Sequence, residues 1–199
     1  MLFSSTFIQI YSLIKFHFLI FSSQISLVHS CSGRLFAAHF CYLTAQLEFS
    51  PYSKPGAKCV LLGSSHTLPF SQFASNSAIM LSLCYEYAKK LHNKNFAIPS
   101  LQPYKYLLAI RLIDWGRPNV ALQYLEQVAI EIIKDPNTYG HQLATHTLEL
   151  SEKIKYSDIS LSLGGDVCDD PDWLVDLRRL VDDAMDGNFR LSERDQHLT

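Results

Sequence analysis

PSLQPYKYLLAIRLIDWGRPNVALQYLEQVAIEII, the stretch from Pro99 to Ile133, decides the fold class of this 199-residue chain. It predicts two amphipathic helices joined by a glycine turn, because apolar residues recur at three- and four-residue steps on both sides of Gly116. Gly116 is expected to adopt the left-handed conformation that commonly follows a helix C-terminus. The apolar stripe of the second helix, which begins near Pro118, is wide, and this width indicates burial on two sides, as in a layered stack.

Four further helices are predicted by the same spacing rule, at about residues 34–47, 76–92, 138–156 and 171–187. The last helix is expected to have Asp170 as its N-cap and Pro171 as its first residue. Its apolar face is predicted as Trp173, Leu177, Leu180 and Ala184. The helix over 76–92 is predicted to have one apolar seam, with Met80 and Cys84 beside it, formed by Ile79, Leu83, Tyr87 and Leu91. The first helix of the Pro99–Ile133 hairpin should bury a wide face made of Tyr104, Leu107, Leu108, Leu112 and Trp115.

Two loop segments precede the helix over 76–92. Lys58–Leu62 (KCVLL) is interpreted as a buried extended connector, because no partner strand is evident. Gly63–His66 (GSSH) places a serine beside a histidine, which would suit a nucleophile loop. The G-x-S-x-G pattern fails because position 67 is threonine, so a polar turn is predicted.

These elements divide the chain into an apolar segment (1–32), a helical solenoid fragment (33–156), a linker (157–170), a final helix (171–187) and a disordered tail (188–199). Met1–Ser30 carries Lys15 as its only formally charged side chain and lacks the basic start of a signal peptide. We interpret this segment first as the product of a misplaced start in a gene model. The second interpretation is a membrane-associating segment over 3–28, in which Lys15 would be costly.

Composition excludes several classes of function. The formal net charge is −2 and the basic residues are scattered, so no nucleic-acid partner is expected. Five cysteines at irregular spacing argue against a disulfide framework. The sequence has no C-x-x-C pair, which argues against a zinc ribbon. A reducing, cytosolic compartment is therefore expected.

No candidate for chemistry survives inspection. The acidic cluster before the last helix (Asp166, Asp169, Asp170, Asp172) fails as a calcium loop, because Pro171 replaces the turn glycine and Leu177 replaces the bidentate glutamate. Gly164-Gly165 lacks the spacing of a nucleotide site. His141 and His146 would lie on different helix faces, which argues against a shared metal ion.

Two further sets of residues are better explained by structure than by chemistry. Ordinary packing explains the aromatic-cage candidates Tyr85, Tyr87, Tyr104 and Tyr106. Exposure or intra-helix pairing explains the helical acids Glu86, Asp114 and Glu126. We predict no catalytic, cofactor-binding or metal-binding residue and no enzymatic activity.

An ordered set of segments resembles one family. The set is Gly33–Phe49 (GRLFAAHFCYLTAQLEF), Cys59–His66 (CVLLGSSH), Ala78-Ile79, Tyr85–Ala88 (YEYA), the Pro99–Gly116 helix, Ala121–Tyr124 and Trp173–Val175 (WLV). Its order and spacing are similar to the C-terminal part of the central domain of the Sec-sixteen family, over about residues 33–185. That family comprises large scaffold proteins of endoplasmic-reticulum exit sites, which organise COPII coat assembly.

The resemblance implies an all-α fold, a partial α-solenoid of antiparallel helix pairs of the ancestral coatomer type. It also implies a non-enzymatic scaffold, peripheral to the cytosolic face of the endoplasmic-reticulum membrane, with COPII inner-coat subunits as partners. The family binds the β-propeller subunit of the outer coat through strands located before Gly33, where this chain has Met1–Ser30 instead. A partial solenoid exposes an apolar layer at its cut end, which predicts self-association. The alternatives are a generic helical-repeat adaptor, for which no internal period is found, and a protein anchored by residues 3–28.

Overall fold

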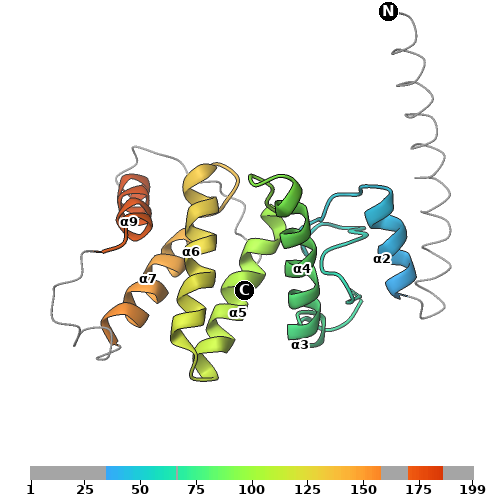
Figure 1. The fold of residues 1–199 in the computed structure, drawn as a ribbon, viewed down its shortest axis with the longest axis horizontal. Coiled ribbons are helices and arrows are strands. Elements are labelled where there is room, and N and C mark those ends of the chain that lie inside the picture. Colours follow the sequence, from blue (N-terminus) through green and yellow to red (C-terminus); the bar gives the residue numbers. More distant parts are fainter. Residues whose placement is uncertain (1–34, 66, 158–169, 186–199) are drawn as a thin grey trace, which may run out of the picture. The chain divides into compact units, whose positions relative to one another are not determined.

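The computed structural model describes residues 35–65, 67–157 and 170–185 and is shown in Figure 1. The chain divides into two compact units, Met1–Leu91 and His92–Thr199. Every regular element within the described residues is a helix, which confirms the all-α prediction. The expectations for residues 1–32, for most of the 157–170 linker and for the tail after Met185 lie outside the described residues.

The first unit contains helices α2 (Leu35–Thr44), α3 (Phe70–Phe73) and α4 (Asn76–His92). Helix α2 ends before the predicted residue 47, because Gln46 takes a positive φ of 56° and reverses the chain there. The backbone N–H of Gln46 donates to the carbonyl of Leu43, and that of Leu47 donates to Tyr42. These two hydrogen bonds form a Schellman-type end in which glutamine takes the usual place of glycine.

The predicted buried connector lies between α2 and α4 in sequence. Every residue from Cys59 to Leu62 is buried, and none of them forms a strand. Two backbone N–H groups at the end of the connector are bonded by side chains from the helices: Ser82 Oγ accepts from the N–H of Leu62 at 2.8 Å, and His39 Nδ1 accepts from that of Gly63 at 2.9 Å. A buried segment without a sheet needs such partners, because unpaired buried N–H groups are costly.

The second unit begins with a short 3₁₀ turn, η1 (Pro99–Leu101), followed by α5 (Gln102–Asp114) and α6 (Pro118–Lys134). The predicted glycine turn joins α5 to α6, as Figure 1 shows. Gly116 has a φ of +70°, its N–H donates to Ile113 at 2.8 Å, and the next N–H donates to Leu112 at 2.8 Å. The αα-hairpin predicted from Pro99–Ile133 is confirmed.

Helices α7 (His141–Ser157) and α9 (Asp172–Met185) complete the second unit. Helix α6 packs against α5, α7 and α9, and α7 also packs against α9. The shared core takes three buried residues from each of α6, α7 and α9, together with Tyr139: Val128, Ala129, Ile132, Leu143, Ala144, Leu148, Leu174, Leu177 and Val181. Helix α6 thus packs against helices on more than one side, as the width of its stripe predicted.

The predicted face of α9 is close to the observed one. Leu177 is fully buried as expected, whereas Trp173, Leu180 and Ala184 lie at the margin and only partly buried. Helix α9 starts at Asp172, one residue after the predicted start at Pro171. Sequence spacing therefore finds the right side of this helix and misses the centre of the buried face.

Candidate protein-interaction surfaces

The two histidines considered for metal binding have separate partners. His141 Nε2 lies 3.3 Å from the hydroxyl of Thr145, and His146 Nδ1 lies 3.9 Å from Glu149. Within residues 35–65, 67–157 and 170–185, no three His, Cys, Asp or Glu side chains gather closely enough to hold a metal ion.

The four tyrosines considered for an aromatic cage lie in different units. Tyr85 packs against Phe49 in the first unit, with ring centroids 5.6 Å apart. In the second unit Tyr104 is buried and Tyr106 stacks on His146 with centroids 6.4 Å apart. Ordinary packing is confirmed for these three residues, and it is wrong for the fourth, Tyr87, which is 64% exposed.

Glu86 is the helical acid whose environment differs most from the prediction. Only 3% of its surface is exposed, so the exposed-face interpretation is wrong. One carboxylate oxygen lies 4.0 Å from the ammonium group of Lys90, one helical turn later, so the predicted intra-helix pairing is confirmed. Asp114 is exposed at the end of α5, and Glu126 is partly exposed on α6.

An ion-pair cluster joins the end of α7 to the start of α9. The Arg178 guanidinium donates to Glu152 at 2.6 and 2.9 Å and to Asp170 at 3.0 Å. Asp170 also accepts from the ammonium group of Lys155 and from the hydroxyl of Tyr156 at 3.1 Å. Hydrogen bonds from Lys155, Arg178 and Tyr156 lower the pKa of the Asp170 carboxyl to about 2.

Sequence reasoning assigned Asp170 as a helix cap and attached no role to Arg178. The structure gives the Asp170 carboxylate a tertiary role, because it binds both the Lys155 ammonium of α7 and the Arg178 guanidinium of α9. Asp170 is separated from each of these partners by eight or more residues in the sequence. No rule based on local spacing could therefore have identified the cluster. The cluster links α9 to α7.

Helix α4 exposes a row of apolar side chains that we name the outer stripe, made of Met80, Cys84, Tyr87 and Leu91. Met80 is 45% exposed, Tyr87 64% and Leu91 72%, and Cys84 is an exposed free thiol. The residues of α4 that are buried are Ala78, Ile79, Ser82 and Glu86. The single seam predicted over Ile79, Leu83, Tyr87 and Leu91 is therefore wrong in its second half.

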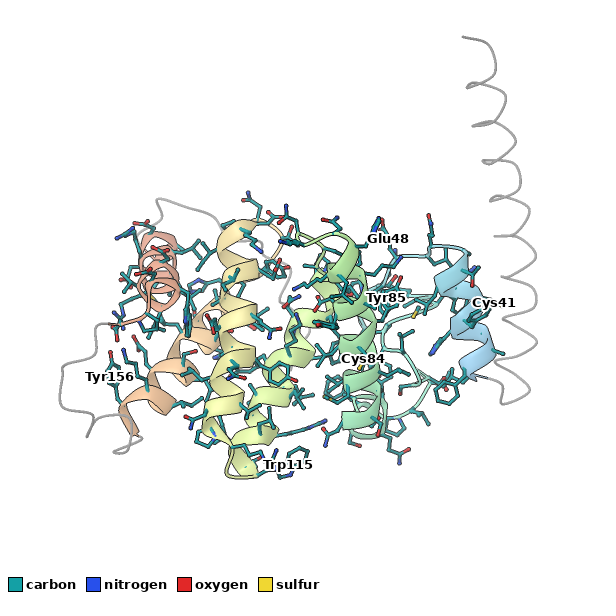
Figure 2. The ribbon with its side chains drawn as sticks, viewed as in Figure 1. Cys41, Glu48, Cys84, Tyr85, Trp115 and Tyr156 are labelled. Atoms are coloured by element: carbon teal, nitrogen blue, oxygen red, sulfur yellow. The ribbon has the colours of Figure 1, made fainter. Side chains whose placement is uncertain are left out.

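A second exposed aromatic residue marks the turn between α5 and α6. Trp115 was predicted on the buried face of α5, but it is 58% exposed. Figure 2 labels it at the end of the hairpin. Position 115 follows the last residue of α5, so the helical period no longer fixes the direction of its side chain.

The surfaces described so far suit binding to another macromolecule. Exposed large apolar residues in a row are a common feature of protein-binding sites. Among the described helices, none combines the length and the hydropathy that crossing a bilayer requires.

The comparisons with known proteins agree with the resemblance seen in the sequence. A family model described as the Sec16 Sec23-binding domain matches residues 24–164. Human protein transport protein Sec16A is 36% identical over 162 residues, which are 78% of this chain and 7% of the relative. Human protein transport protein Sec16B is 37% identical over 159 residues, which are 79% of this chain and 15% of the relative.

A plant relative, the protein transport protein SEC16A homolog of Arabidopsis thaliana, is 38% identical over 96 residues, covering 48% of this chain and 7% of the relative. The chain thus spans only a small part of the length of these three relatives. None of the solved structures matches it significantly. Because the family model covers well over half of its residues, the chain belongs to the Sec16 family.

Proposed function

We propose that this chain acts as a non-enzymatic scaffold segment in COPII coat assembly, in protein transport from endoplasmic-reticulum exit sites. The observation that carries the proposal is the match of residues 24–164 to the Sec16 Sec23-binding domain. The relatives Sec16A and Sec16B are both named as protein transport proteins, which supports the same process. The proposed partner is Sec23 of the inner coat.

The proposed architecture is a partial α-solenoid over residues 33–156, with the segment 171–187 as a final helix docked on it and 157–170 as the linker. The packing of α6 against α5, α7 and α9 supports this arrangement, since solenoids bury each helix against its neighbours. The ion pairs of Arg178 with Glu152 and Asp170 support docking of the final helix.

The proposed mode of action is binding through helical surfaces, at a site peripheral to the cytosolic face of the membrane. The exposed outer stripe and Trp115 support this mode, because such residues are frequent binding anchors. The β-propeller subunit of the outer coat serves as a comparison for Sec23 and is not the proposed partner. In the family that the chain resembles, this subunit binds to strands that precede the helices.

Fluorescently tagged full chain expressed in cells tests this proposal. The expected result is puncta that coincide with Sec23 and a protein that sodium carbonate extracts from membranes, since protein contacts are disrupted at high pH. A matched control is the same tag on the chain with Ala129→Asp, which places an unpaired charge in the core of the second unit. A uniform distribution of the folded chain, or resistance to carbonate, would contradict the proposal.

A further inference from the structure

We propose that the hydrogen bond between His39 and Gly63 is an acid-sensitive latch, which opens when the imidazole gains a proton and then frees the loop at Gly63. This property is independent of the proposed partner, because it concerns how the first unit holds its own loop. The direction of the hydrogen bond, the burial of the ring and the charges around it support the assignment.

The hydrogen bond of the latch has only one possible direction. The backbone N–H of Gly63 can only donate, so Nδ1 of His39, 2.9 Å away, is the acceptor and carries no proton. The imidazolium form of histidine has an N–H group at both ring nitrogens. A protonated His39 therefore places two N–H groups face to face, and its bond to Gly63 is lost.

The His39 ring is buried beside groups that stay neutral. Only 5% of its surface is exposed, so a positive charge there would lose most of its hydration. Tyr42 is next to it, with ring centroids 6.2 Å apart, and Cys59 of the connector packs in the same cluster as Tyr42. Burial raises the pKa of Tyr42 and raises the pKa of Cys59 to about 12. Neither side chain offers a negative charge to an imidazolium near neutral pH.

The carboxylates of the first unit are engaged or exposed. Among its described residues they are Glu48 and Glu86. Glu48 is exposed in the loop after α2, whereas Glu86, on the buried side of α4, lies 4.0 Å from the ammonium group of Lys90. The one buried carboxylate thus has a cation of its own helix as a partner. The other lysines of the described first unit are exposed: Lys54, Lys58 and Lys89.

Acid should open the latch, because the open state binds a proton that the closed state does not. A histidine outside the fold has a pKa close to 6.5, so the latch is closed above this pH and is progressively lost below it. Between pH 7.5 and 5.5 the equilibrium constant for closing should fall by about tenfold. Opening frees the end of the buried connector at Gly63, while Ser82 continues to hold Leu62.

Amide hydrogen exchange of the full chain, read by NMR at Gly63, tests the inference. The protection factor corrects for the intrinsic pH dependence of exchange, and in the wild type it should fall about tenfold from pH 7.5 to 5.5. His39→Asn puts a carbonyl oxygen, which accepts and does not titrate, in place of Nδ1, so the change should be less than about twofold. The matched control is His146→Asn, because this exposed histidine of the second unit should leave the tenfold fall unchanged.

Two further measurements separate the latch from other sources of acid sensitivity. His66 follows Gly63 by three residues and lies outside the described residues, so His66→Asn is included, and the fall should persist in it. In wild-type chain with ¹⁵N-labelled histidines, the His39 ring should carry its proton on Nε2 and none on Nδ1 at pH 7.5. This second measurement tests the latch even where His39→Asn does not fold.

Three results would overturn the inference. One is a Gly63 protection factor that does not change between pH 7.5 and 5.5. The second is a fall of equal size in the folded His39→Asn variant, or the loss of the fall in the folded His66→Asn variant. The third is a doubly protonated His39 ring in a chain whose Gly63 amide stays protected.

Discussion

At the scale of single residues, Gly63 shows how a loop in the first unit depends on the absence of a side chain. Its φ is +77°, a conformation in which L side chains are strained. A Cβ added there would lie 3.2 Å from both Phe36 and Leu81, and the N–H of Gly63 is held by His39. The sequence predicted a polar turn here and could not reveal these tertiary contacts.

Gly63→Ala should lower the free energy of unfolding by about 1–2 kcal/mol, because it combines backbone strain with a tight contact. Gly56→Ala is the matched control: Gly56 has a φ of +72° and nothing within 4 Å of the added Cβ, so only the backbone cost of about 1 kcal/mol remains. Urea denaturation followed by circular dichroism measures both. A Gly63→Ala variant as stable as the wild type would contradict this account of the loop.

At the scale of elements, the ion-pair cluster fixes α9 to α7. Asp170→Asn removes the carboxylate shared by Lys155, Tyr156 and Arg178, and it should lower the free energy of unfolding by roughly 1 kcal/mol at neutral pH, since the cluster is partly exposed. Asp176→Asn on the same helix is the control, because its carboxylate is 53% exposed and 3.8 Å from Arg179.

The effect of Asp170→Asn should depend on pH in a defined direction. The pKa of Asp170 is about 2 in the folded chain and close to 3.9 for an unfolded aspartate. A carboxyl with a lowered folded pKa stabilises the fold above the unfolded value and ceases to do so as the pH falls through the folded value. The stability difference from wild type should therefore be constant above about pH 5 and shrink from about pH 4 to 2. Urea titrations at several pH values would measure it, and a difference that grows on acidification would contradict the assignment.

Helix α4 shows at this scale what spacing can predict. Its bounds, 76–92, agree with the prediction: Ser75, whose hydroxyl accepts from the N–H of Ala78 at 3.3 Å, precedes the helix, and Asn93 follows it. The seam through Ile79, Leu83, Tyr87 and Leu91 was predicted with steps of four only, and each such step turns about 40° around the helix. The row therefore starts on the buried face at Ile79 and ends on the exposed face at Leu91, and which face is buried depends on the neighbours of α4.

At the scale of the whole molecule, the helical class and the α5–α6 hairpin could be predicted, because periodicity and the Gly116 turn are local signals. The family could be predicted as well, since an ordered set of short segments is specific where each alone is not. The ion-pair cluster of Arg178 and the exposure of the outer stripe could not be predicted. Both depend on which segments distant in sequence pack together, and this information is absent from local patterns.

The most direct test of the central claim is capture of purified Sec23 by the purified full chain, with the β-propeller subunit of the outer coat measured in parallel. The account predicts saturable binding of Sec23, and loss of that binding when Ala129→Asp disrupts the buried core between α6 and its neighbours. A folded, helical chain that fails to bind Sec23 at any accessible concentration would contradict the proposed function and leave only membership of the family.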